Sequence, residues 1–221
     1  DSYLSKSVIG TRALSSVLVK GKTDGSGIKV TTYNITYCTT GMYQNALATA
    51  GIEDAEIVVA GPYNISGTAA LVGAIKSYEN MTGETVSQEN VDTATNELVV
   101  TGKLAESVGD SDKAEQLVGA VKEQVVEGSD NGKELTEEEI GNVVDQAAQE
   151  MDVQLSDEDR QEIVDLMDKI KGLDIDVDSL KEQAKDLYDK IDDLGLKLDW
   201  NQEKVQGFFS KIIEFFKNLF S

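Results

Sequence analysis

The chain has 221 residues, a formal net charge of −21 and no histidine, and 40% of its residues are apolar. These values fit a globular protein with one domain or two small ones. The negative charge argues against nucleic acid as a partner, because phosphate backbones repel such a surface. The lack of histidine excludes Ser-His and Cys-His nucleophiles and nearly all zinc sites.

Charge divides the sequence into three parts. Residues 105–200 carry a net charge of −19, whereas residues 1–104 carry −3 and residues 201–221 carry +1. Together with the pattern of apolar residues, this predicts an α/β module at 1–85, an acidic helical region at 86–199 and an amphipathic C-terminal helix at 200–221. The predicted fold class is α+β, with a small mixed β-sheet and crossover helices before the helical region.

The predicted module begins with two strands, at Ser15–Val19 and at Ile28–Ile35. A helix with Thr40 as its cap should then run to Ala50, and Gly51 should close it. The apolar run Ile57–Ala60 is typical of a strand that is covered on both faces. Alternating strands and helices predict a parallel crossover between neighbouring strands.

After this run, Gly61 and Pro62 are expected to turn the chain, and Ser66 is expected to cap a helix that Gly83 ends. Its inward residues should be Leu71, Ile75, Tyr78 and Met81.

From Ser87 onward the sequence predicts helices almost throughout. Helix boundaries are expected at Ser87, at 109–111 and at Gly128, and capping boxes are expected at Thr136 with Glu139 and at Ser156 with Asp159.

Four stretches of the chain resemble the YpuA-like family, secreted proteins of Gram-positive bacteria whose domain has no known function. They are Ser7–Val19, Gly27–Ile35, Met42–Gly51 and Ile65–Leu71. The resemblance covers about residues 3–190 and is specific, because several long motifs occur in the family's order. It implies export from a Gram-positive cell, to the medium or the cell surface, and it implies no activity.

The N-terminus departs from this family. Its members have a further segment of strand and helix character before the position equivalent to Tyr3, and this chain opens at Asp1 without a signal peptide. The chain therefore reads as a processed or excised product. If the missing segment supplies a strand, its removal bares a sheet edge that can pair with another chain. Self-assembly by strand addition is the resulting hypothesis.

Three features could carry chemistry. Ser66, Gly67 and Thr68 stand between a strand and a helix, where backbone N–H groups bind anions, although a plain turn is the favoured interpretation. The acids of Asp174–Asp178 alternate as in a calcium loop, but Ser179 replaces the turn glycine, so no metal site is predicted. Cys38 has no base to activate it and is interpreted as a packed thiol. No cofactor and no catalytic residue are predicted.

The C-terminal helix is the strongest signal for an interaction, because it holds every phenylalanine of the chain. At about 100° per residue, its apolar side chains from Val205 to Phe220 fall within an arc of roughly 160°. The expected interaction face consists of Trp200, Val205, Phe208, Phe209, Ile212, Ile213, Phe216, Leu219 and Phe220. This face can pack on the protein's own core, bind another copy or a partner, or lie on a membrane surface.

These observations favour a non-enzymatic extracellular structural or interaction protein, a self-assembling surface subunit whose partner is itself or another surface protein. One alternative is a membrane- or wall-associated binding module that the C-terminal helix anchors. A further alternative is a carboxylate-dependent hydrolase, which requires two facing acids in a cleft.

Overall fold

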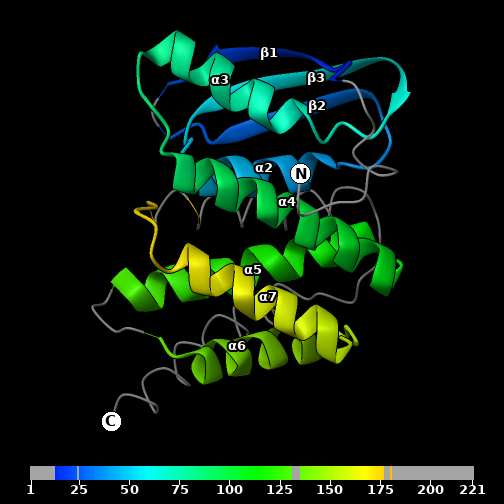
Figure 1. Cartoon of the computed structure of the whole chain (residues 1–221), viewed down its shortest axis with the longest axis vertical. Coiled ribbons are helices and arrows are strands. Elements are labelled where there is room, and N and C mark those ends of the chain that lie inside the picture. The colour runs from blue at the N-terminus through cyan, green and yellow to red at the C-terminus, as the bar shows by residue number, and fades with distance from the viewer. Residues whose placement is uncertain (1–12, 24, 131–134, 177–179, 181–221) are drawn as a thin grey trace. The chain divides into compact units, whose positions relative to one another are not determined.

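The computed structural model describes residues 13–23, 25–130 and 135–176, together with Leu180. These residues belong to one compact unit within Asp1–Leu187 (Figure 1). A second unit, Tyr188–Ser221, lies outside the described residues, and the expected interaction face of the C-terminal helix lies outside them too.

The sheet has three described strands in the order β1-β3-β2, with β1 at Ser16–Gly21, β2 at Ile28–Ile35 and β3 at Ala55–Ile65. Strand β3 pairs antiparallel with β1 and parallel with β2, so the sheet is mixed, as predicted. The parallel pair is joined by helix α2, Thr40–Thr49, which is the predicted crossover. The α+β fold class is confirmed.

The register of the sheet separates an inner face from an outer face. Val19, Ile57 and Val30 lie in one row across the three strands, and Ile57 and Val30 are buried. This inner face packs against α2 and against α3, Ala70–Thr82. The alternate residues of each strand point to the outer face, since side chains alternate along a strand.

Strand β3 is longer than the sequence predicted, and the expected turn at Gly61 and Pro62 is wrong. Both residues lie in β3, where residues 61–64 form a bulge between the pairs Tyr33–Ala60 and Ile35–Ile65. Asn34 lies opposite the bulge with a φ of 57°, and its side-chain amide donates to the Gly61 carbonyl at 2.9 Å. A proline is tolerated here because bulged residues are released from ladder pairing.

The caps of the first two helices also differ from the prediction. Thr39, not Thr40, caps α2, because its hydroxyl accepts from the Met42 N–H. Ser66 does not cap α3, which begins at Ala70 after a cap residue, Ala69, with no side-chain hydrogen bond. Among the predicted inward residues of α3, Leu71 and Ile75 are buried but Met81 is exposed. Gly83 ends the helix with a φ of 80°, as predicted.

Within the described residues, four further helices follow: α4 at Gln88–Val108, α5 at Ser111–Asp130, α6 at Glu137–Glu150 and α7 at Asp157–Ile170. Ser87 caps α4, and both predicted capping boxes are present, one on α6 and one on α7. Gly128 was expected to end a helix, but α5 continues through it. The Leu135 side chain packs against this glycine, and a side chain there would crowd it.

The boundary expected near residue 85 falls between α3 and α4, yet helices on both sides of it pack together. Helix α2 contacts α4 and α5, and α5 in turn contacts α6 and α7. Figure 1 shows α2, α4 and α5 between the sheet and α6. The α/β elements and the acidic helices therefore share one core within the first compact unit.

Candidate functional site

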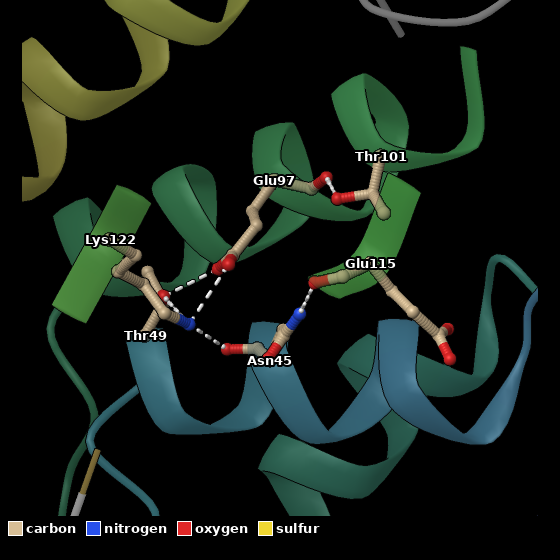
Figure 2. Close-up of polar contacts among 6 residues, drawn as sticks. All are labelled: Asn45, Thr49, Glu97, Thr101, Glu115 and Lys122. Atoms are coloured by element: carbon tan, nitrogen blue, oxygen red, sulfur yellow. Dashed lines mark hydrogen bonds and ion pairs between the residues drawn. The ribbon is translucent and has the colours of Figure 1, made fainter. Parts of the chain in front are cut away.

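A cluster of buried polar side chains lies where α2, α4 and α5 meet (Figure 2). Buried polar groups are costly unless they are hydrogen-bonded, so such a cluster marks either a functional site or a point that fixes the packing. Its members are Asn45 and Thr49 on α2, Glu97 and Thr101 on α4, and Glu115 and Lys122 on α5.

Lys122 is at the centre of this cluster. Its Nζ lies 2.9 Å from Glu97 Oε1, 2.8 Å from the Asn45 carbonyl oxygen and 3.2 Å from the Thr49 hydroxyl. An ammonium group has three N–H donors, and these three contacts use all of them. The Lys122 side chain is 2% exposed and the Glu97 side chain is 0% exposed.

The Glu97 carboxylate is satisfied from two sides. Lys122 binds its Oε1, and the Thr49 hydroxyl donates to its Oε2 at 2.5 Å. Thr49 thus donates to Glu97 and accepts from Lys122, which is possible because a hydroxyl has one proton and two lone pairs. The Thr101 hydroxyl donates to the Glu97 backbone carbonyl at 2.8 Å. Glu97, Lys122 and Thr49 thus each bond to the other two.

Glu115 occupies the N-terminal end of α2. Its carboxylate accepts from the hydroxyl of Thr39, the cap of that helix, and its backbone carbonyl accepts from Asn45 Nδ2 at 2.9 Å. Gly41, in the first turn of α2, leaves the space for this carboxylate, since a Cβ there would overlap it. Negative charge is favourable at a helix N-terminus.

Two charged residues of α5, Glu115 and Lys122, complement the dipole of α2. Glu115 binds its N-terminal end, and Lys122 binds the Asn45 carbonyl and the Thr49 hydroxyl toward its C-terminal end. The two residues share a face of α5, being seven positions apart. This seven-residue spacing is visible in the sequence, but it recurs among the many charged residues of the helical region and does not single out the cluster. The cluster fixes how α5 packs on α2.

The cluster offers little to a substrate. The Lys122 amine is buried and all of its donors bind the protein's own oxygen atoms, so it is not available as a nucleophile. Removing one partner of such a pair leaves an uncompensated buried charge, which typically costs about 3–5 kcal/mol. The geometry therefore indicates a structural role.

Cys38 is buried, in agreement with the packed thiol predicted from the sequence. Burial raises the pKa of its thiol to about 12, against a smaller lowering by a hydrogen bond with Tyr43. Burial likewise raises the pKa of Tyr43, whose hydroxyl donates to the Gly67 carbonyl at 2.6 Å. A protonated, enclosed thiol is not reactive.

The predicted anion-binding residues form the connection between β3 and α3. Ser66 and Thr68 are half-buried with their hydroxyl oxygens 3.5 Å apart, and Gly67 is buried with a φ of 87°. The Ser66 carbonyl accepts from the Cys38 N–H, at 3.1 Å. These contacts explain how the turn is held, and anion binding stays a prediction.

The alternating acids at 174–178 lie partly outside the described residues, since only Asp174 and Asp176 of the series are described. Within the described ranges, no group of three or more acidic or cysteine side chains is placed to hold a metal ion. None of the helices in that part of the chain combines the length and apolar character that crossing a bilayer requires.

The outer face of the sheet is the second candidate site, and we call it the outer sheet face. Three rows of residues cross it: Lys20, Glu56 and Lys29; Leu18, Val58 and Thr31; and Ser16, Ala60 and Tyr33. Leu18 is 53% exposed and Tyr33 is 58% exposed. Among the described helices, α2 and α3 make extensive contacts with the sheet, and they pack on the inner face. Sequence reasoning missed this surface, although Val-Leu-Val in β1 is apolar on both faces.

Comparison with known proteins places the chain in a family. A family model described as "Protein of unknown function (DUF1002)" matches residues 1–187. The chain belongs to this family. A relative in Bacillus subtilis (strain 168), "Uncharacterized protein YpuA", is 39% identical over 181 residues, which are 82% of this chain and 61% of the relative. The chain therefore spans less than two thirds of that relative. No solved structure matches it.

The family assignment confirms the YpuA-like resemblance found in the four sequence stretches. It assigns no activity, ligand or partner, because the family is described as one of unknown function and the relative as an uncharacterized protein.

Proposed function

We propose that this DUF1002 protein is a non-enzymatic extracellular structural or interaction protein, a surface subunit that self-assembles through a sheet edge and its C-terminal helix. The observation that carries the proposal is strand β1. It is an edge of the described three-stranded sheet, and its central residue, Leu18, is 53% exposed.

An edge strand presents backbone N–H and C=O groups that can pair with a strand of another chain. Soluble proteins protect such edges with charges, prolines or a covering element. In β1, lysine occurs only near the end, at Lys20, and the preceding residues are Ser16, Val17, Leu18 and Val19. Within the described residues, no further strand pairs with this edge.

The buried polar cluster supports the non-enzymatic part of the proposal. Its charged groups are hydrogen-bonded to the protein itself, and Lys122 has no donor left for a substrate. The thiol of Cys38 is enclosed, and its raised pKa keeps it protonated. The described residues that most resemble catalytic groups thus serve the fold.

The test is the oligomeric state of the full chain by light scattering and negative-stain electron microscopy. Leu18→Glu places a charge in the middle of the edge and should reduce self-association. Val72→Glu is the matched control, because Val72 is 41% exposed on α3. A third variant, truncated after residue 199, measures how much the C-terminal helix contributes to self-association. Monomeric native protein at every concentration, or equal association of all variants, overturns the proposal.

A further inference from the structure

We propose that the outer sheet face binds the acidic surface of α6 and α7 on a second copy of the chain. This inference rests on the proposed self-assembly and adds a further contact to those of the sheet edge and the C-terminal helix. On α6 the acidic surface consists of Glu138 and Asp145, and on α7 of Glu158 and Asp165, all of which are exposed.

The first step of the argument is the charge of the whole molecule. Two copies that each carry −21 repel one another, and this repulsion opposes association in most orientations. Association is favoured only where a basic surface of one copy meets an acidic surface of the other. The location of exposed lysines therefore decides which orientation can occur.

The outer sheet face has such a basic region. Lys20 and Lys29 flank Glu56 in one row across the sheet, and the nearby Lys22 also lies 3.0 Å from Glu56. Three lysines thus surround one acid, and no ion pair of Lys29 is found within the described residues. Beside this row, Leu18 and Tyr33 supply exposed apolar and aromatic area, which interfaces favour.

The helices α6 and α7 provide the complementary surface. Glu138 and Asp145 are seven residues apart on α6, and Glu158 and Asp165 are seven apart on α7, so each pair lies along one face of its helix. The first turn of each helix adds further acids. Arg160 pairs with Asp145, with its Nε 2.6 Å from Asp145 Oδ1, so the negative charge of this surface comes mainly from Glu138, Glu158 and Asp165.

The two surfaces lie on different elements of one unit. The sheet packs against α2 and α3, whereas α6 packs against α5 and α7. Figure 1 shows α2, α4 and α5 between the sheet and α6. A contact between unlike surfaces is heterologous, and repetition of such a contact builds a ring or an open filament. The expected product is therefore a ring or an open filament of subunits rather than an isologous dimer.

The experiment is a charge swap in the full chain, with self-association measured by light scattering. Lys20→Glu with Lys29→Glu should weaken association roughly tenfold, since each exposed ion pair contributes a modest amount. Adding Glu158→Lys and Asp165→Lys to the same chain should restore it. Lys76→Glu is the control, because Lys76 is exposed on α3, away from the outer sheet face. Circular dichroism verifies that each variant is folded.

Each outcome bears on a different claim. Weakening by the lysine reversals, no effect of Lys76→Glu and rescue by the second pair support the inference. The inference is overturned if the native chain associates and the lysine reversals do not weaken that association, or if the second pair of substitutions does not restore it. The proposed self-assembly is unaffected by either result. A monomeric native chain overturns both. Association should also fall at about 1 M salt, where the screening length is about 3 Å.

Discussion

Lys122 Nζ lies 2.9 Å from Glu97 Oε1 in an ion pair that joins α5 to α4 with almost no exposure to solvent. Lys122 also binds α2 through the Asn45 carbonyl and the Thr49 hydroxyl. The Lys122 side chain thus connects α5 to both α4 and the crossover helix α2. The packing of these helices depends on this pair.

Breaking the pair from one side should be strongly destabilising. Lys122→Met leaves the Glu97 carboxylate buried without its cation, so we expect the free energy of unfolding to fall by about 3–5 kcal/mol. Glu97→Leu should have a similar cost, and the double variant should cost less than the two single changes combined. Urea unfolding of the four proteins measures this coupling. Additive effects would show that the pair does not act as a unit.

Gly41 should not tolerate a side chain. A Cβ at this position overlaps the Glu115 carboxylate at the N-terminus of α2, so Gly41→Ala should destabilise the protein by about 1–3 kcal/mol. Gly73→Ala, in α3, is the matched control, since its Cβ meets Val17 at 3.4 Å. The control should be close to neutral. Thermal unfolding compares them, and equal losses from both substitutions would contradict the packing described.

Asp54 should make stability depend on acid pH. Partial desolvation raises the pKa of its carboxyl, but hydrogen bonds from the N–H groups of Gly25, Gly27 and Ser26 outweigh that effect and lower it. A depressed folded-state pKa means that the stabilisation is present above the unfolded-state value and is lost as the pH falls through the folded-state value.

Asp54→Asn should therefore lower stability by about 1 kcal/mol at neutral pH, a value kept small by solvent screening. The difference from the native chain should vanish in acid, below the folded-state pKa. Urea unfolding across this pH range gives both curves. A difference that stays constant with pH would show that the Asp54 charge is not the cause.

Cys38 should resist alkylation in the native protein. Its thiol is buried and its pKa is raised to about 12, so almost no thiolate exists at mildly alkaline pH. Iodoacetamide labelling followed by mass spectrometry should show modification only after unfolding in urea. Rapid labelling of the folded chain would place this thiol at an accessible position.

Most helices and strands could be predicted from apolar periodicity and capping residues, because both are local features of the sequence. Ser87, Thr136 and Ser156 cap helices through contacts three residues away, which a sequence displays directly. The turn predicted at Gly61 and Pro62 was wrong because these residues, which are typical of turns, lie in a bulge of β3. The bulge depends on pairing with β2, which the local sequence does not show. Gly128 misled the prediction as well, since its role is to admit Leu135 from a following segment.

The candidate site was not predictable for a similar reason. Glu97 and Lys122 are far apart in the chain and come together only when α4, α5 and α2 pack. Nothing distinguishes these two residues in the sequence from the many charged residues on solvated helix faces. The outer sheet face required the register of three strands, which places Lys29 and Lys20 on either side of Glu56.

Self-assembly of the full native chain is tested most directly by its molar mass, measured by light scattering over a range of concentrations at low salt. We predict a mass that rises with concentration beyond that of the 23.9 kDa monomer and that falls when Leu18 is replaced by glutamate. A constant monomer mass over the whole range, with the chain folded, would contradict the account.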